Sequence, residues 1–276
     1  MPTVAVAGGS RSDILELVRH SRVEGNEDLT FKVFDVDPNI DTEGLWEYTP
    51  CENEGDMVYQ TVKCVADGKA DILLKSGVQT HALLKEVLKK EHGLRNQDLL
   101  SHVVLVDLPQ LKRPILLTDS GMNIAPTIDQ LEVIIENAIE TSKRIGLTKP
   151  KVALLSAAEN LNPKMSSSVM ANELTERFST NSNATVYGPL SLDLSLSKEA
   201  VKSKRFEGPI QGDADILVVP GIDAGNVLYK SFVLFGGARM GGSIVGAKVP
   251  IVLTSRSDQV KSKLYGLEFA LMQLKK

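Results

Sequence analysis

The sequence is poor in the residues that stabilise disulfide-rich or metal-bound folds. Its 276 residues include two cysteines, four histidines and one tryptophan, and aromatic residues make up 5%. The two cysteines, Cys51 and Cys64, lie in a polar stretch without a CxxC motif or a neighbouring histidine, so we expect neither a metal site nor a structural disulfide. No histidine lies in a metal-ligand spacing or near a GxSxG-type nucleophile, so we assign none to chemistry.

The sequence also lacks a dense positive charge and a long apolar run. Its formal net charge is -4 and its pI is about 5.7, which argues against nucleic acid or an anionic membrane as the main partner. No apolar run approaches the roughly 20 residues that span a bilayer, and the N-terminus lacks the basic leader of a signal peptide. We therefore expect a cytoplasmic protein that binds neither membrane nor nucleic acid.

Short apolar strands alternate with amphipathic helices along the chain. This alternation predicts an α/β protein in which helices flank largely parallel sheets. About ten strands would be wide for a single twisted sheet, so we expect two lobes with a boundary near Pro126. The predicted strands are 3–7, 31–36, 70–74, 102–106, 114–118, 151–156, 184–187, 214–219 and 244–253. The predicted helices are 12–23, 80–91, 128–145, 165–178, 227–235 and 257–273.

Ligands of parallel sheets bind beyond the carboxyl ends of the strands, where helix N-termini present unpaired N–H groups. One such strand ends at Pro220, and Asp223, Gly225 and Asn226 follow it in the predicted turn, with Lys230 one helical turn later. Gly225 would let a ligand approach the backbone, and Asn226 could donate to a phosphate or carbonyl oxygen. The spacing alone favours the simpler alternative, in which Asp223 is a helix N-cap and Lys230 is a solvated side chain.

A second apolar strand runs into the segment Thr-Ser-Arg-Ser-Asp at residues 254–258. Ser255 offers a hydroxyl, and Arg256 offers a permanently charged fork that matches phosphate. Asp258 is a candidate proton acceptor, although capping of the last helix by Ser257 or Asp258 explains the same residues.

Three further strand ends carry polar residues that are also compatible with plain turns. They are Gly77 with Thr80, the segment that ends at Asn123, and the segment that ends at Asp193. The turn at residues 6–10 contains two glycines but follows neither the GxGxxG nor the P-loop pattern, so we do not assign it to nucleotide binding.

Several segments occurring in order resemble the phosphate acetyl/butyryltransferase family, and its butyryl branch in particular. They lie between about residues 70 and 262, whereas the first 65 residues carry little recognisable motif. The matching segments are Thr118–Pro126, Asn162–Met165, Gly188–Asp193, Asp213–Pro220, Asp223–Asn226 with Lys230, and Val245–Arg256.

The resemblance implies the reaction of acyl-CoA with phosphate to give acyl phosphate and CoA, in either direction. Coenzyme A is then a substrate, and no cofactor, metal or covalent enzyme intermediate is expected. The implied fold is that of isocitrate and isopropylmalate dehydrogenases, with the active site in an interlobe cleft. On this basis residues 1–126 and 245–276 form the first lobe and residues 127–244 the second. The resemblance also implies a homo-oligomer.

By the same resemblance, Ser255 orients the CoA thiol and Arg256 neutralises phosphate charge. The carboxylate that the acetyl branch uses as a base falls near Val260 or Ser262 in an ungapped comparison, so Asp258 takes that role only with a shift. Substrate contacts are expected at Gly77, Thr80, Asn123, Asp193, Asp223, Gly225, Asn226 and Lys230.

The expected function is transfer of a short acyl group, butyryl or branched-chain. Two other functions remain open. One is phosphate acetyltransferase activity, which differs in the size of the acyl pocket. The other is a catalytically silent domain that senses acyl-CoA. A dehydrogenase of the related fold is disfavoured because no cluster of metal-binding aspartates stands out.

Overall fold

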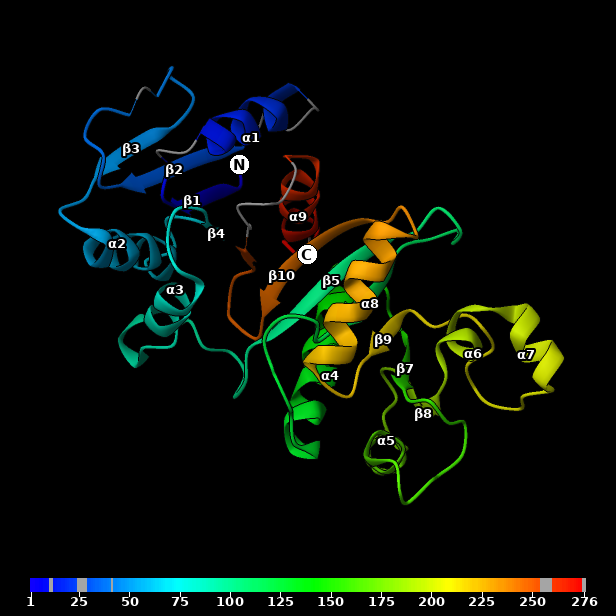
Figure 1. Ribbon diagram of the computed structural model, residues 1–276. Helices are drawn as coiled ribbons and strands as arrows, with labels where there is room; N and C mark the ends of the chain where they lie inside the picture. The colour runs from blue at the N-terminus through cyan, green and yellow to red at the C-terminus, as the bar shows by residue number, and fades with distance from the viewer. Residues whose placement is uncertain (10–11, 24–28, 41, 254–259, 275–276) are drawn as a thin grey trace. The chain divides into compact units, whose positions relative to one another are not determined.

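The chain divides into two compact α/β units. The structure is a computed structural model that describes residues 1–9, 12–23, 29–40, 42–253 and 260–274. Unit 1 consists of Met1–Asp98 and Gly241–Lys276, and unit 2 consists of Leu99–Met240 (Figure 1). The predicted α/β class is confirmed. The first division between the units falls after Asp98 instead of near Pro126.

Unit 1 is built on a largely parallel sheet. Its strands are β1 (Thr3–Ala7), β2 (Thr30–Asp35), β3 (Glu47–Pro50), β4 (Ile72–Lys75), β10 (Arg239–Val245), which begins at the unit boundary, and β11 (Ile251–Leu253), in the order β3-β2-β1-β4-β11-β10. All pairs are parallel except β10 with β11, where Ile244 lies opposite Ile251. The prediction of one strand over residues 244–253 is therefore wrong. Gly246, with a φ of 92°, reverses the chain between the two strands.

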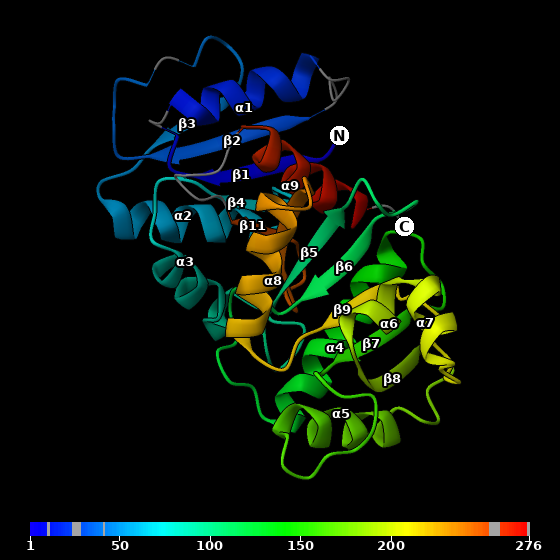
Figure 2. The same ribbon diagram turned by 45° about the vertical axis from the view of Figure 1, so that its right-hand side comes forward.

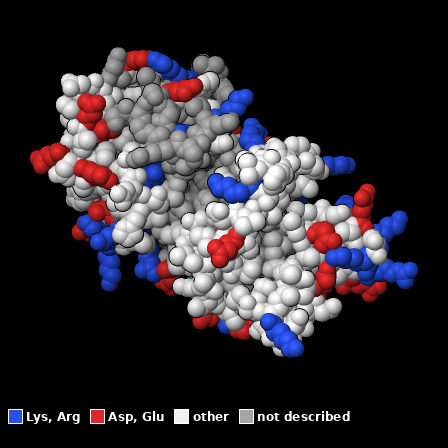
Figure 3. Space-filling model, viewed as in Figure 1, with Lys and Arg blue, Asp and Glu red and all other residues white. Residues whose placement is uncertain are grey.

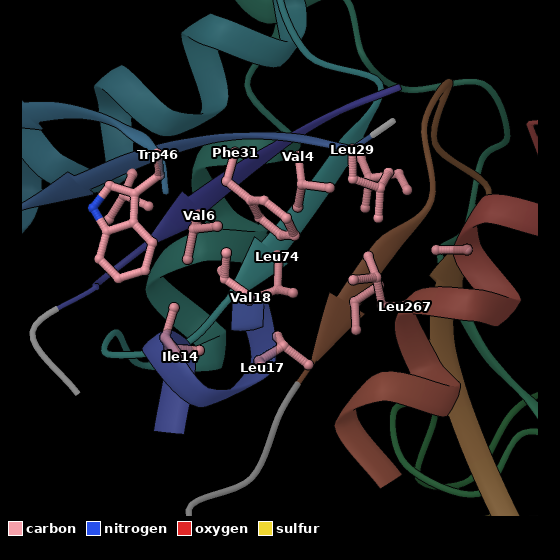
Figure 4. Packing of buried hydrophobic residues seen from close by; sticks show 14 of the residues in the cluster. Val4, Val6, Ile14, Leu17, Val18, Leu29, Phe31, Trp46, Leu74 and Leu267 are labelled. Atoms are coloured by element: carbon pink, nitrogen blue, oxygen red, sulfur yellow. The ribbon is translucent and has the colours of Figure 1, made fainter. Parts of the chain in front are cut away.

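The helices of unit 1 cover both faces of its sheet. They are α1 (Ser12–Val23), α2 (Glu54–Ala66), α3 (Thr80–Val87), the 3-10 helix η1 (Lys90–His92) and α9, which is described over Val260–Met272. Figure 2 shows α1 on one side of the sheet and α2 and α3 on the other. Ile14, Leu17 and Val18 of α1 pack with Leu267 of α9 against the strands, and Phe31 of β2 is fully buried in the same cluster (Figure 4).

The sequence did not predict β3 or α2. The side chain of Asn53 caps α2 by accepting a hydrogen bond from Asp56 N at 3.0 Å. Buried residues then recur at helical spacing from Met57 to Val65 and pack the helix into unit 1. Cys51 and Cys64 are both buried and free.

Unit 2 contains five strands with mixed pairing. Its strands are β5 (Ser101–Asp107), β6 (Ile115–Thr118), β7 (Lys151–Leu155), β8 (Thr185–Leu190) and β9 (Ile216–Val218), in the order β5-β6-β9-β7-β8. β5 and β6 form an antiparallel pair, and β6 is hydrogen-bonded in parallel to β9. Because of these pairings, residues 99–126 belong to unit 2 and not to unit 1 as predicted.

The helices of unit 2 also cover both faces of its sheet. They are α4 (Ile128–Arg144), α5 (Ser166–Arg177), α6 (Leu192–Leu196), α7 (Lys198–Lys204) and α8 (Ile222–Leu234). Thr127 and Gln130 form a capping box at the start of α4. Leu194, Val201 and Phe232, from α6, α7 and α8, pack against one face of the sheet. Among the helices that the structure describes in either unit, none is long and apolar enough to cross a bilayer.

Candidate active site

The carboxyl ends of three neighbouring strands meet at one edge of the unit 1 sheet. Ala7 of β1 and Leu253 of β11 are both in register with Lys75 of β4. Two predicted substrate contacts follow β4 at this edge, namely Gly77 in the turn and Thr80 at the first position of α3, and both are exposed. The α3 N-cap, Gln79, makes no side-chain capping bond, so this helix N-terminus has the polarity that attracts an anion.

The turns that follow β1 and β4 lie in direct backbone contact. Gly8 has a φ of +90°, and a Cβ on it would lie 2.5 Å from the Gly77 nitrogen. Gly77 N in turn donates to Ala7 O at 3.0 Å. Close packing of two backbones therefore accounts for the glycine in the first turn without a bound nucleotide.

Sequence reasoning missed Ser76, which lies between the two turns. Its residue exposure is 2%, and its Oγ has no hydrogen-bond partner in the described part of the chain. An unsatisfied buried hydroxyl costs about 1–3 kcal/mol, so an uncompensated group at a strand end is a candidate ligand contact. Burial distinguishes Ser76 from other serines, and a sequence does not show which hydroxyl stays unpaired.

The predicted catalytic residues Ser255, Arg256 and Asp258 lie outside the described residues. They follow Leu253, which ends β11 at the same edge as Ser76 and Gly77. Their predicted roles in thiol orientation, phosphate binding and proton transfer therefore stay predictions.

The carboxyl edge of the unit 2 sheet contains a turn organised by the buried carboxylate of Asp119. This carboxylate accepts hydrogen bonds from five groups of the described chain, namely the backbone nitrogens of His102, Gly121, Met122 and Asn123 and the Nδ2 of Asn123, at 2.7–3.3 Å. Asn123 Nδ2 also donates to Leu100 O at 3.0 Å. Both amide donors of Asn123 are thus used within the protein, and its geometry is that of a positioning residue.

His102 is a second residue of this turn that the sequence did not single out. Its Nδ1 lies 3.3 Å from Ser120 Oγ. Removal from water lowers the pKa of His102 below its ordinary value, and the Asp119 carboxylate offsets part of that shift. The neutral imidazole therefore predominates at neutral pH.

Asp193, in the first turn of α6, belongs to an ion-pair group at the surface of unit 2. Lys204 Nζ lies 3.0 Å from Asp193 Oδ2 and 2.7 Å from Glu159 Oε1. Hydrogen bonding from Ser191 and the Lys204 ammonium hold the pKa of Asp193 below its ordinary value. These partners orient the start of α6, and no described interaction joins Asp193 to the Asp119 turn.

Helix α8 begins five residues earlier than predicted, after the N-cap Gly221. Asp223, Gly225 and Asn226 therefore lie in its first turns and not in a turn before it, and Asp223 is not the N-cap. Gly225 is buried where a Cβ would lie 2.7 Å from Asp119 O and 2.8 Å from Ser120 Cα. The absence of a side chain at Gly225 lets α8 approach the Asp119 turn.

The polar side chains of α8 remain exposed beside this contact. Asp223, Asn226 and Lys230 have no ion-pair or hydrogen-bond partner among the described residues. Lys230 Nζ lies 5.3 Å from the centroid of the neighbouring Tyr229 ring. Of the residues predicted from this segment, the structure thus brings Gly225 next to the Asn123 turn and leaves the others open to solvent.

An apolar cavity of about 550 Å³ opens at the carboxyl ends of β7 and β9. Leu155, Pro220, Leu192 and Val227 supply much of its wall, and Asp223 is its charged residue among those described. Its size and its few polar groups are typical of a small-molecule site.

Two buried groups in unit 1 are explained without catalysis. Burial raises the pKa of the Cys51 thiol to about 11, which keeps it protonated and unreactive at neutral pH. His92 Nε2 lies 2.7 Å from Glu86 Oε1, and Lys89 Nζ lies 2.8 Å from Glu86 Oε2. With Glu91 these residues could face a metal ion, but the Glu86 carboxylate is already neutralised by the Lys89 ammonium.

The two α/β units, with polar turns and helix N-termini at the carboxyl ends of parallel strands, define a ligand-binding α/β fold of the dehydrogenase type. A putative 4-hydroxythreonine-4-phosphate dehydrogenase from Salmonella typhimurium shares it with a TM-score of 0.63, 12% identity and 99% coverage of both chains. The chain belongs to the phosphate acetyl/butaryl transferase family, whose sequence pattern matches residues 47–268. The predicted family and its acyltransferase class are thereby confirmed.

Two relatives are similar over much of the chain. A branched-chain phosphotransacylase from Enterococcus faecalis V583 has a crystal structure with a TM-score of 0.96, 57% identity and 99% coverage of both chains. A probable phosphate butyryltransferase from Bacillus subtilis is 43% identical over 212 residues, which are 76% of this chain and 71% of that protein.

Proposed function

We propose that the chain transfers a short acyl group, butyryl or branched, between coenzyme A and inorganic phosphate. The observation that carries this proposal is the 57% identity to a branched-chain phosphotransacylase over 99% of both chains. The open apolar cavity of unit 2 supports it, because a wall that includes Leu155, Leu192 and Val227 suits a group with several methylene or methyl carbons.

The proposed chemistry needs an anion site and a place for the departing thiol. A phosphate oxygen attacks the thioester carbonyl, the C–S bond breaks, and the sulfur leaves with the electron pair and is then protonated. Arg256 and the N-terminus of α3 at Thr80 bind the phosphate, and Ser255 orients the sulfur. Ser76 donates its otherwise unpaired hydroxyl to the same substrate.

In the reverse direction, from acyl phosphate and CoA, a residue must accept the proton of the CoA thiol. A thiol of pKa near 8.5 needs a base to ionise at neutral pH. Asp258 is the candidate, and helix capping is its alternative role. Asp258→Asn separates the two, because the amide keeps a capping oxygen but accepts no proton. Loss of turnover that is partly restored at high pH would assign the base, and wild-type turnover would assign the cap.

In unit 2 we retain Asn226 as a substrate contact at the start of α8, and we assign Gly225 to the packing of α8 on the Asp119 turn. We assign Asn123 and Asp193 to positioning, because their polar groups bond within the protein. Coenzyme A acts as a substrate and the reaction proceeds without a metal or other cofactor. We further propose a cytoplasmic location, where acyl-CoA and phosphate are both present.

A panel of acyl-CoA esters tests this function. The purified chain is incubated with phosphate and each ester from acetyl to hexanoyl, including isobutyryl and isovaleryl, and free thiol is followed. We expect phosphate-dependent thiol release that is fastest with four- or five-carbon groups, unchanged by a chelator and retained when Cys51 and Cys64 are both replaced by serine. An acetyl optimum would favour phosphate acetyltransferase, and acyl-CoA binding without turnover would favour a sensor.

A further inference from the structure

A second cavity of unit 2, of about 570 Å³, lies between α7 and the segment that leads into β9. Asp213 lines it three positions before β9, and the Oδ2 of this residue accepts a hydrogen bond at 2.7 Å from Nζ of Lys151, the first residue of β7. The cavity therefore lies at the amino ends of β7 and β9, whereas the apolar cavity lies at their carboxyl ends, and the two share no lining residue. We call it the amino-end pocket. Its polar and aromatic lining consists of Lys198, Lys202, Arg205, Phe206, Glu207, Gln211 and Asp213.

Three basic side chains of the amino-end pocket have no partner within the described chain. Lys198 and Lys202 lie four positions apart on α7 and Arg205 follows three positions later, so all three lie on one side of the helix. Each is exposed, and none makes an ion pair or a side-chain hydrogen bond with a described residue. Figure 3 shows basic side chains around α7 with acidic ones close by.

The acidic side chains near α7 do not neutralise this group. Asp213 is paired with Lys151, which leaves Glu207 as the one unpaired carboxylate of the pocket among the described residues. Lys204, on the same helix but outside the pocket, accounts for Asp193 and Glu159. The pocket therefore carries an excess of positive charge on a chain whose net charge is negative, and it suits an anion with more than one charge.

The backbone of Arg205 is a second unusual feature of the pocket. Arg205 has a φ of 51° at the C-cap of α7, a left-handed conformation in which glycine is favoured. An arginine at this position lowers the stability of the helix end relative to glycine. Local strain of this kind is a reason to look for a function of the side chain, and here the side chain lines a cavity.

Phe206 gives the pocket a fixed aromatic surface. Its ring centroid lies 6.2 Å from that of Tyr187, and a Cβ on Gly208 would lie 2.4 Å from two of its ring carbons. The side-chain amide of Gln211 donates to Phe206 O and Gly208 O, at 3.3 and 2.8 Å, and so holds the backbone of this segment. The ring is thus held in position before any ligand arrives. An aromatic ring next to several cations is the combination that binds a base together with its phosphates.

We propose that the amino-end pocket binds a nucleoside polyphosphate at a site separate from acyl transfer. The phosphates lie against Lys198, Lys202 and Arg205, and the base lies against Phe206. A single inorganic phosphate would leave most of the cavity empty and would not use the aromatic ring. The unpaired carboxylate of Glu207 accepts hydrogen bonds, so it favours a base with an exocyclic amino group, such as adenine over hypoxanthine.

Calorimetric titration of the full chain with ATP tests the site. Saturating CoA is present, because its nucleotide portion resembles ATP and would occupy the substrate site. We expect one ATP per chain, and a Kd at least about tenfold higher for Lys202→Gln and for Arg205→Gly, since each loses a charge-assisted contact. The matched control is Lys204→Gln, which removes the same charge from the same helix outside the pocket and should keep the Kd within about twofold. No ATP binding, binding abolished by CoA, or equal Kd values in Lys202→Gln and Lys204→Gln would overturn the proposal.

A second set of measurements tests the base contact and the fold. ATP should bind more tightly than ITP or tripolyphosphate, and Phe206→Leu should raise the Kd for ATP towards that for tripolyphosphate, because the aromatic face is lost. The melting temperature of Arg205→Gly should equal or exceed that of the wild type, since glycine suits the left-handed C-cap, so its weaker binding would not result from unfolding. Equal affinities for ATP and tripolyphosphate in the wild type would contradict a nucleotide site.

Discussion

The polar groups at the carboxyl ends of the strands are hydrogen-bonded differently in the two units. In unit 2 the Asp119 carboxylate accepts five hydrogen bonds from its own turn and from the His102 backbone, so each of these donors has a partner within the protein. In unit 1 the corresponding strand ends hold Ser76, a buried hydroxyl with no hydrogen-bond partner among the described residues, close to the N-terminus of α3, which has no side-chain cap. The contrast indicates that the unit 2 turn fixes the position of α8, whereas we expect substrate to supply the missing partner at the unit 1 strand ends.

The largest expected effect lies in unit 2 and concerns stability. Asp119→Ala leaves five N–H groups without their acceptor, and we expect the free energy of unfolding to fall by about 3 kcal/mol or more. Asp119→Asn retains one acceptor oxygen and should lose less. Urea denaturation measures both, with Asp223→Ala as the control, for which the loss stays below about 1 kcal/mol. A small loss in Asp119→Ala would remove the proposed structural role of the turn.

The next effect belongs to the segment after β11 and concerns catalysis. Arg256→Ala should lower kcat/KM by at least about a hundredfold, or roughly 2.7 kcal/mol, because a charge-assisted donor to phosphate is lost. Arg256→Lys should recover only part of this, since the charge remains but the fork is gone. Melting temperature should stay unchanged in both variants. Steady-state kinetics near the wild-type values in a folded Arg256→Ala protein would exclude this residue from the site.

The substitution Ser76→Ala tests the role of the unit 1 strand ends, because it should change stability and activity in opposite directions. Removing an unpaired buried hydroxyl should raise the free energy of unfolding by up to about 1 kcal/mol, while kcat/KM falls about tenfold as a substrate contact is lost. Ser21→Ala is the matched control, because Ser21 is fully buried in unit 1 and its Oγ donates to Val18 O at 2.8 Å. The control should lose stability and keep its activity. If both variants behave alike, Ser76 is an ordinary core serine.

The smallest effect is a pH dependence of unit 2. The pKa of His102 is lowered in the folded chain, so its neutral form is favoured there and the stability it contributes is present above the unfolded pKa of about 6.5. That contribution is lost as the pH falls below this value. The melting temperature of the wild type should therefore decrease more steeply from pH 7 to pH 5 than that of His102→Gln. Parallel curves would show that His102 does not contribute.

Most of the strands and helices could be predicted because their apolar spacing is strong. Helix α4, for example, repeats apolar residues over several turns and ends before Gly146. Helix α2 was missed because Thr61, Lys63 and Cys64 dilute its apolar spacing, and only the packed structure shows which of them is buried. The hairpin of β10 and β11 was missed because Gly246 reverses the chain inside a run that otherwise suits one strand.

The candidate site was less accessible to sequence reasoning. Residue type identified Asn123 as a ligand contact, but its hydrogen bonds to Leu100 and Asp119 depend on segments brought together only by folding. Gly225 was selected for ligand approach, and the structure shows instead a backbone packed on Asp119 and Ser120. Ser76 belongs to no sequence motif. Whether its hydroxyl has a hydrogen-bond partner depends on the residues that surround it in the folded chain.

The hydrophobic core of unit 1 limits the positions at which this chain could be joined to a related protein in a chimera. The family pattern begins at residue 47, yet nine of the 15 buried residues in this core cluster precede that position, from Val4 to Trp46. β1 also lies between β2 and β4 in the sheet, so its removal would leave β4 without a neighbour on that side. A chimera joined at residue 47 would combine half of one core with half of another. Crossover points after Asp98 and Met240 would instead keep the residues of the unit 1 core cluster together, at the expense of a junction inside β10.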